Sequence, residues 1–298
     1  MAGLDTFLEN DIRTELDKTH LKYRIFSRIK KGESITEKIT RKHYQKGGRI
    51  LQDLIGIRIT TYFTDDMEIV SFVLKALFEL VEEVVDFPDP YTFKPKRRNY
   101  VFKIPEAYQA FFIEHCREFI GLVDSTFEVQ IRTVFSEGWH EIEHDYHYKP
   151  IVENSSWKNE TERRLNSIIA TLELCEQNLL SVLSDCAIEF NDNNQFEAAL
   201  CNYLHIELKR MDFPSEVLTK LQKDKNTTKR MLLVDRKTFL ITLYDNRINL
   251  PPTLSNYFFA LSAFCGVDEF ENDEPSIFSH EFNRLRELGK SQITNNEL

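Results

Sequence analysis

One short segment, residues 127–133 (FEVQIRT), constrains the fold of this chain more than any other. Apolar and polar residues alternate through it without interruption. Because successive side chains of a β-strand point to opposite faces, the segment predicts a strand with one face in a core. The polar face suggests the wall of a pocket, although a half-exposed strand in contact with water would produce the same pattern. The apolar positions are Phe127, Val129 and Ile131, and the polar ones are Glu128, Gln130 and Arg132.

Further strands and helices surround this segment. Residues 54–63 (LIGIRITTYF) are β-branched and largely apolar and predict a second strand. Residues 81–86 and 100–104 predict two more, and residues 4–31 and 67–80 have the apolar spacing of helices. Beyond Ser136 the spacing stays helical, although residues 229–244 could also form a hairpin. The sequence therefore predicts an α+β fold, in which a mixed sheet flanked by helices is followed by an all-helical C-terminal extension.

Composition narrows the class of protein. The 298 residues are 42% hydrophobic, which is enough for one large core or two small ones. The net charge of −10 does not favour nucleic acid or an anionic membrane, although basic clusters at residues 30–49 and 94–98 can override this mean locally. Five scattered cysteines without CxxC spacing are typical of reduced thiols in the cytoplasm. No apolar run is long enough to cross a bilayer, and the acidic N-terminus is no signal peptide.

The basic cluster at residues 30–49 has the features of a phosphate-binding site. Ser34 and Glu37 form a capping box, with Ser34 as the predicted N-cap of a helix that ends at Gly47-Gly48. A helix N-terminus presents free N–H groups and the positive end of the helix dipole to an anion. Lys30, the Ser34 hydroxyl and Lys38 would complete a phosphate cradle. An ordinary capping box beside a solvated basic face explains the same residues.

A second segment, residues 53–58 (DLIGIR), offers a carboxylate and a cation on either side of a glycine. An Asp at the start of a strand can hold Mg²⁺, and Gly56 permits the close approach of a ligand, or a bulge. Strict alternation would send Asp53 and Arg58 to opposite faces, so both can serve one site only with a bulge or a late start of the strand. A surface Asp and a solvated Arg are the alternative for this segment taken alone.

Taken in order along the chain, these segments resemble the synthetase domain of the RelA/SpoT-like alarmone synthetases. The matching runs are YRIFSRIKKGESITEKITRK, DLIGIRI, EVQIRT and WHEIEHDYHYK, within residues 21–149. The resemblance implies a nucleotidyltransferase-like core, which we assign to residues 1–185, and Mg²⁺ as the cofactor. Most of residues 150–298 carry no motif of the family, and the helical spacing predicts a helical extension in residues 186–298.

The resemblance also implies how ATP is bound. Arg28 and Arg58 would sandwich the adenine, using the planar faces of their guanidinium groups. Lys30, Ser34 and Lys38 would hold the phosphates.

For catalysis, the resemblance assigns Mg²⁺ binding to Asp53 and Glu128, and Glu128 would also take the proton of the attacking 3′-hydroxyl. Two carboxylates on neighbouring strands can share a hard cation, while lysines neutralise phosphate charge. The implied supporting residues are Gln130, Arg132, Glu143, His144 and Lys149.

The segment expected to bind the acceptor departs from the family pattern PK-x-N-G-Y-R-S-x-H. Residues 95–104 read PKRRNYVFKI, so Asn99 replaces the Gly, Phe102 the Ser and Ile104 the His. A carboxylate at Glu137 could accept hydrogen bonds from guanine N1–H and N2–H, but it is also a common acid near a helix N-terminus. Tyr100 falls where the family's Tyr stacks on guanine. The residues expected to contact the acceptor are Tyr100, Lys96, Arg97, Arg98 and Glu137.

Residues 140–144 (HEIEH) also fit H-E-x-x-H, the signature of zinc proteases. Histidines four residues apart converge on one side of a helix, and His147 adds a third imidazole on nearly the same face. However, the synthetase pattern itself has W…EH…YK at this point, and Trp139, Glu143, His144 and Lys149 meet it. A polar helix face that braces the synthetase site is therefore favoured over zinc hydrolysis.

These observations favour an ATP-dependent pyrophosphokinase that transfers the β,γ-pyrophosphate of ATP to the 3′-hydroxyl of GDP or GTP. The altered acceptor segment leaves open a toxin-like relative that modifies the 3′-end of tRNA or makes adenosine alarmones, and the basic run at residues 94–98 would suit a polyanion. A nucleotide sensor without catalysis is a further alternative, which the complete donor motifs disfavour. The sequence predicts no membrane contact, and it leaves open a homo-oligomer and an antitoxin partner.

Overall fold

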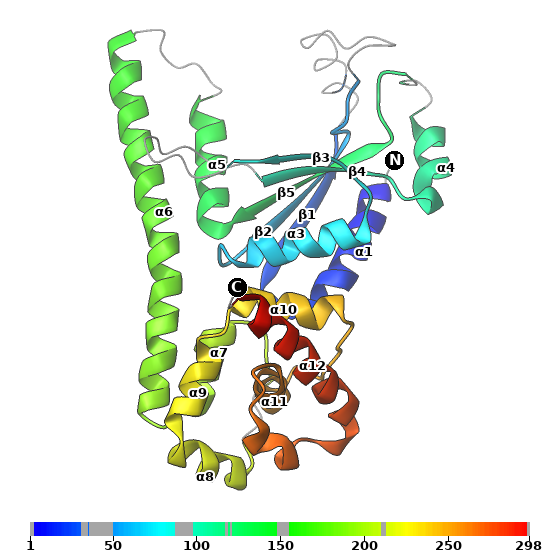
Figure 1. The fold of residues 1–298 in the computed structure, drawn as a ribbon. Helices are drawn as coiled ribbons and strands as arrows, with labels where there is room; N and C mark the ends of the chain where they lie inside the picture. The colour runs from blue at the N-terminus through cyan, green and yellow to red at the C-terminus, as the bar shows by residue number, and fades with distance from the viewer. Residues whose placement is uncertain are drawn as a thin grey trace. The chain divides into compact units, whose positions relative to one another are not determined.

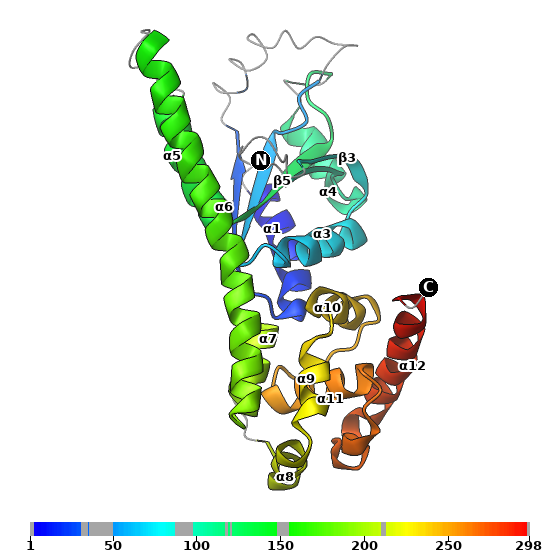
Figure 2. The same cartoon turned by 60° about the vertical axis from the view of Figure 1, so that its left-hand side comes forward.

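The computed structural model describes residues 3–30, 35, 50–86, 98–116, 119, 121–147, 155–209 and 213–296. The chain forms two compact units, one of residues Met1–Asp17 and Tyr23–Gln177, the other of Lys18–Lys22 and Asn178–Leu298. The division between the units falls inside helix α6 (Ser155–Asp192), which Figure 2 shows as continuous. The predicted boundary between residues 185 and 186 falls in the same helix and stays a prediction.

The first unit is built on a five-stranded mixed sheet in the order β1-β2-β5-β4-β3. All neighbouring strands pair antiparallel except β2 and β5, which are parallel. The mixed sheet, its flanking helices and the helical C-terminal region confirm the predicted α+β fold (Figure 1). The strands are β1 (Tyr23–Ile29), β2 (Ile55–Thr61), β3 (Leu80–Val85), β4 (Arg98–Lys103) and β5 (Thr126–Thr133).

The helix expected over residues 4–31 is wrong in its second half. Helix α1 (Leu4–Leu16) is followed by a 3₁₀ turn, Asp17–Thr19, and His20 then takes a left-handed φ of 56°. Residues 23–29 (YRIFSRI) form β1, which pairs with β2 along its whole length. Pairing with a neighbouring strand overrides the helical spacing, because strand formation depends on cross-strand packing more than on local preference.

One face of the sheet is buried against helices. Four residues of α1 at helical spacing are fully buried, and α1 and α3 (Asp66–Leu77) cover this face (Figure 1). Burying each large apolar side chain contributes about 1.5–3 kcal/mol to folding. The opposite face of the sheet carries the polar and partly exposed residues that alternate with these apolar ones. The buried apolar residues that line the covered face include Ile55, Ile57, Ile59, Phe127, Val129 and Ile131.

Two further helices of this unit follow strands directly. Helix α4 (Glu106–His115) comes after β4, and α5 (Val134–His147) begins at the residue after β5. Because no residue separates β5 from α5, the first turns of α5 lie close to the end of β5. This position brings two glutamates of α5 to the site residue Arg58. The helix expected to begin at Ser34 lies outside the described residues.

The second unit is helical, as predicted, in the parts of the chain that the structure describes. Residues 229–244 form parts of two helices and not a hairpin. The second helix begins after Asp235, whose carboxylate caps it by accepting a hydrogen bond from the Thr238 N–H at 2.9 Å. The helices are α7 (Phe196–Leu204), α8 (Ser215–Lys223), α9 (Lys225–Leu232), α10 (Arg236–Asp245), α11 (Leu254–Phe264) and α12 (Ser279–Asn296).

The core of this unit forms around α11. Its Phe258 ring lies 5.0 Å from that of Phe270, and its Phe259 ring lies 6.2 Å from that of Phe282. No described helix of either unit has both the length and the apolar character needed to cross a bilayer.

Candidate active site

The open face of the sheet carries polar side chains that the strand register aligns. Residues opposite each other in paired strands face the same side of a sheet, so three lateral rows run across β1, β2 and β5. The alternation predicted for residues 127–133 is confirmed by their burial, and it sets these rows. The rows are Arg28–Gly56–Glu128, Phe26–Arg58–Gln130 and Arg24–Thr60–Arg132.

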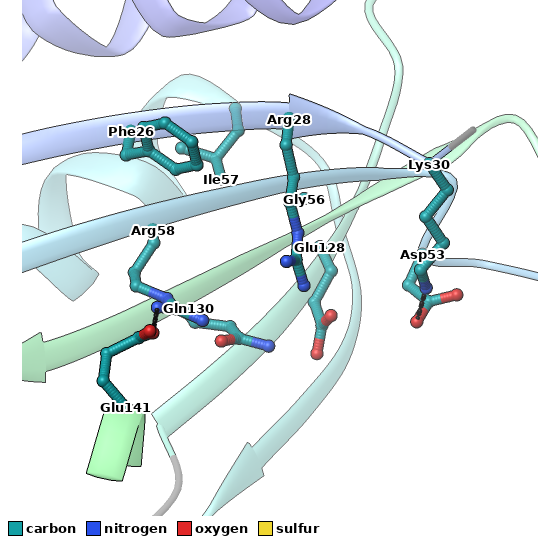
Figure 3. Close-up of a pocket in the computed structure, with 10 residues that line it drawn as sticks. All are labelled: Phe26, Arg28, Lys30, Asp53, Gly56, Ile57, Arg58, Glu128, Gln130 and Glu141. Carbon is teal, nitrogen blue, oxygen red and sulfur yellow. Dashed lines mark hydrogen bonds and ion pairs between the residues drawn. The ribbon is translucent and has the colours of Figure 1, made fainter. Parts of the chain in front are cut away.

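A cavity of about 260 Å³ lies over the first two rows (Figure 3). It brings together residues from three segments that are far apart in the sequence, and it combines cations with carboxylates. Five of the residues expected to bind ATP and Mg²⁺ line it, namely Arg28, Lys30, Asp53, Arg58 and Glu128. The other lining residues are Phe26, Gly56, Ile57, Gln130 and Glu141.

At one end of the cavity, Lys30 Nζ and Asp53 Oδ2 form an ion pair. Asp53 precedes Ile55, the first residue of β2, so strand alternation does not govern the direction of its side chain. The late start of the strand thus resolves the conflict between Asp53 and Arg58. The Asp53 side chain is 24% exposed, which leaves its carboxylate within reach of a ligand in the cavity.

The carboxylates of Asp53 and Glu128 form a donor set that fits a hard cation. Figure 3 shows both side chains directed to the same side of the sheet, into the cavity. Mg²⁺ prefers oxygen ligands and usually takes only one or two protein carboxylates while it keeps several waters. Histidine and cysteine, which zinc prefers, are absent from the described residues that line the cavity.

Gly56 leaves room for the Arg28 side chain to cross β2. Arg28 extends from β1 over Gly56 toward Glu128 (Figure 3). A Cβ atom at Gly56 would lie 4.0 Å from Cγ and Nε of Arg28, which is ordinary contact, so a side chain larger than alanine would displace the arginine. The glycine therefore keeps the guanidinium group close to the surface of the sheet.

Helix α5 directs two carboxylates at Arg58. Arg58 Nη1 donates to Glu137 Oε1 at 2.5 Å and to Glu141 Oε1 at 2.6 Å, and Arg132 Nε lies 3.6 Å from Glu137 Oε2. Burial lowers the pKa of Arg58, but its hydrogen bonds to the two glutamates outweigh this effect and the pKa is raised. Burial and the nearby charge of Arg58 lower the pKa of Arg132. Arg58 is thus a charged group held in one orientation.

These ion pairs contradict the expected guanine contact of Glu137. Its two carboxylate oxygens face Arg58 and Arg132, so they are not directed at the N–H groups of a base. Glu141, which would be the general base of a zinc protease, lines the cavity and pairs with Arg58 instead.

The prediction that Tyr100 contacts the acceptor is wrong, whereas the contact expected of Arg98 stays a prediction. Tyr100 is 1% exposed, and its hydroxyl lies 2.7 Å from Ser71 Oγ in α3, under the covered face of the sheet. The two-residue period of β4 puts Arg98 on that same face, and Asn99 on the cavity face. A fully buried ring cannot stack on an acceptor base.

Tyr100 is therefore expected to act on stability. Tyr100→Phe removes the hydrogen bond to Ser71 and should lower the free energy of unfolding by about 1 kcal/mol, measured by urea denaturation. The acceptor KM should not change. Ser71→Ala combined with Tyr100→Phe should cost less than the sum of the two single changes, because both remove one interaction. An unchanged unfolding free energy in Tyr100→Phe would contradict the buried role.

Several predicted site residues lie outside the described part of the chain, namely Ser34, Lys38, Lys96, Arg97 and Lys149. So do the side chains of Glu143 and His144, whose backbone belongs to α5. Their roles stay predictions. The supporting residues Gln130 and Arg132 do lie on the cavity face, where Arg132 Nη2 donates to Gln130 Oε1 at 3.4 Å.

Sequence reasoning missed Phe26, although a signal for it exists. Phe26 is two residues from Arg28 on β1, so the period of two puts both on one face, and Lys30, which follows the last residue of the strand, lines the same cavity. Its ring is 64% exposed. A second cavity, of about 390 Å³, lies beside the first and shares Phe26 and Arg58 with it. An exposed aromatic ring between two cavities offers a platform for a planar ligand.

The cavity lies in the part of the chain that matches a known family. Residues 27–152 match the family model described as "Region found in RelA / SpoT proteins". This segment contains every lining residue of the 260 Å³ cavity except Phe26. The chain therefore carries a RelA/SpoT region, and the resemblance seen in its sequence motifs is confirmed.

Among solved structures, the chain is similar to small alarmone synthetases. Small alarmone synthetase 1 from Bacillus subtilis is 22% identical, and the match covers 60% of this chain and 87% of that one with a TM-score of 0.44. A GTP pyrophosphokinase family protein from Streptococcus pneumoniae is 19% identical over 66% of this chain and 90% of that one, with a TM-score of 0.42. A search of curated proteins found no match.

Proposed function

We propose that this chain transfers the β,γ-pyrophosphate of ATP to the 3′-hydroxyl of GDP or GTP and so makes (p)ppGpp. The observation that carries the proposal is one cavity within a RelA/SpoT region that holds the cations Arg28, Lys30 and Arg58 together with the carboxylates Asp53 and Glu128. Pyrophosphate transfer requires charge neutralisation and positioning more than covalent chemistry, and this set of side chains supplies both.

The face of β1 offers a direction for the bound ATP. Lys30 follows the last residue of β1 and is four residues from Phe26, so roughly 13 Å of extended chain separates their Cα atoms. The phosphates would lie at the Lys30 end. Arg28, which the family resemblance assigned to the adenine together with Arg58, is directed toward Glu128 and would instead neutralise further phosphate charge. The adenine would lie at the other end, against the planar face of Arg58 and beside the Phe26 ring. Ser34 and Lys38 would complete the phosphate contacts.

Asp53 and Glu128 would hold Mg²⁺, which when bound supplies positive charge to the phosphate oxygens. Glu128 would accept the proton of the acceptor 3′-hydroxyl while the 3′-oxygen of the acceptor bonds to the β-phosphorus of ATP. The bond from that phosphorus to the oxygen it shares with the α-phosphate then breaks, and AMP leaves. Lys30 and Arg28 would stabilise the negative charge on the transferred group.

The test is transfer of label from γ-³²P-ATP to GDP, GTP, ATP and total tRNA, at about 50 and about 200 mM salt. We expect labelled GDP and GTP products with a mild effect of salt, and no product with the Asp53→Asn control. Transfer to tRNA that falls steeply with salt, as phosphate contacts require, would instead support the toxin-like alternative. ATP binding without transfer to any acceptor would overturn the proposal in favour of a nucleotide sensor.

A further inference from the structure

One hydrogen bond in the cavity region comes from a residue that the family pattern does not provide. Asn99 Nδ2 donates to Glu128 Oε1 at 3.0 Å, and both side chains are partly buried. Where this chain has Asn99, the pattern PK-x-N-G-Y has a glycine, which has no side chain that could donate. The contact is therefore a property of this chain and cannot be inferred from the RelA/SpoT motifs.

The register of β4 and β5 makes the contact possible. Asn99 lies opposite Gln130, and Glu128 lies opposite Val101, so Asn99 and Glu128 are diagonal neighbours on one face. Such neighbours are roughly 7–8 Å apart, which two polar side chains of this length can bridge. Val101, directly opposite Glu128, has no polar side-chain atom. The other diagonal neighbour of Glu128 on β4 is Lys103, whose ammonium group pairs with Glu79. Asn99 is the diagonal neighbour whose side chain donates to the Glu128 carboxylate.

The two carboxylates of the cavity that are proposed to hold the cation have partners of different charge. Asp53 pairs with the ammonium group of Lys30, which compensates part of its negative charge. Glu128 accepts from an amide, which orients the carboxylate but carries no charge. An ionised carboxylate has about four acceptor directions, so one amide hydrogen bond leaves Oε2 and part of Oε1 to other ligands. Asn99 therefore orients Glu128 without adding a charge to its surroundings.

We propose that Asn99 is a positioning residue, which holds the Glu128 carboxylate in the orientation that binds the divalent cation and accepts the proton of the acceptor hydroxyl. This inference rests on the proposed function, because it uses both roles of Glu128. Hydrogen-bond partners of metal ligands fix the direction of the ligand, and replacing such partners typically weakens metal binding or activity by roughly 10- to 100-fold.

The test compares Asn99→Leu, which keeps the approximate shape and removes the donor, with Asn99→Gln, which keeps an amide. Asn193→Leu is the matched control, because Asn193 is exposed and its amide donates to a helix backbone carbonyl. Mn²⁺ is titrated into the full chain saturated with AMPCPP, an ATP analogue with an uncleavable bridge between the α- and β-phosphates. Free Mn²⁺ is followed by electron paramagnetic resonance, against a blank of nucleotide alone.

We expect Asn99→Leu to weaken Mn²⁺ binding by about 10-fold or more, Asn99→Gln to weaken it less, and Asn193→Leu to leave it unchanged. In turnover assays kcat should fall in the same order, while the KM for ATP stays within about twofold because Arg28, Lys30 and Arg58 are intact. Equal losses in Asn99→Leu and Asn99→Gln would overturn the positioning role, since the second variant retains the donor.

Glu128→Gln, titrated in parallel, separates the failure of this inference from the failure of the proposed function. If Glu128→Gln loses Mn²⁺ affinity and Asn99→Leu keeps it, Asn99 is not a positioning residue and the proposed function stands. If Glu128→Gln binds Mn²⁺ unchanged, the metal site is wrongly assigned and both proposals fail. Should Asn99→Leu not fold, Asn99→Ala removes the same donor without adding apolar bulk, and the same two outcomes decide.

Discussion

Glu128→Gln should reduce pyrophosphate transfer by at least about two orders of magnitude, with little change in the free energy of unfolding. The new side chain has the same shape, and its amide oxygen can still accept the hydrogen bond of Asn99. It lacks the charge that holds the cation and the basicity that removes the proton. A bound metal contributes several kcal/mol of transition-state stabilisation, and each 1.36 kcal/mol is a factor of ten in rate. Initial rates at saturating ATP, GDP and Mg²⁺ measure the loss.

Asp53→Asn should cause a comparable loss of transfer for the same reason. It also removes the ion pair between Asp53 and Lys30, but a partly exposed pair of this kind typically contributes about 1 kcal/mol or less to stability. Glu82→Gln, which changes an exposed carboxylate of β3 in the same sheet, is the matched control and should retain full activity. Full activity in Glu128→Gln or in Asp53→Asn would reject the catalytic assignment.

Arg58→Ala should weaken ATP binding by about one to two orders of magnitude and leave the acceptor KM nearly unchanged. Stacking of a base on a planar side chain typically contributes about 1–3 kcal/mol, and the loss of the guanidinium group removes both the stack and a positive charge. Two glutamates of α5 already hold this guanidinium group in place, so the binding of ATP does not carry the entropy cost of ordering the Arg58 side chain. Titration calorimetry with AMPCPP measures the affinity.

Arg58→Lys distinguishes stacking from charge. An ammonium group keeps the positive charge but has no planar face and no fork of donors for two carboxylates, so most of the affinity should still be lost. Arg163→Ala removes an exposed arginine of α6 and should have no effect. A thermal melt of each variant checks that the loss of the contacts from Arg58 to Glu137 and Glu141 has not unfolded α5. ATP affinity that is unchanged in Arg58→Ala would contradict the donor assignment.

The sequence by itself determined which residues of β5 face the cavity. Alternation along a strand is a local property, so FEVQIRT places Glu128, Gln130 and Arg132 in one row whatever the neighbouring strands are. The motif order likewise predicted that residues 28–30 and 53–58 meet Glu128 at one site, and all of the charged residues named from them that the structure describes line the cavity. Local patterning therefore sufficed for β5, whose alternation is unbroken, but not for residues 23–29, where pairing with β2 overrides the helical spacing.

Only the tertiary structure decided which face of β4 meets the cavity. The run RNYVFK places Asn99 and Tyr100 on opposite faces, but it does not say which face is covered. A shift of one residue would exchange every side chain between the two faces. Pairing with β5 and the contact of Tyr100 with Ser71 of α3 fix the register, which sends Tyr100 into the core and Asn99 to Glu128.

The partners of the charged side chains were also decided by the tertiary structure. Arg58 is 79 positions from Glu137 and 83 from Glu141 along the chain, yet both glutamates hold it. A sequence shows how many charges there are, but a long flexible side chain pairs with whichever opposite charge folding brings within about 4 Å. The short connection from β5 into α5 brings these two, and this is why a glutamate predicted to recognise guanine instead orients the arginine proposed to bind adenine.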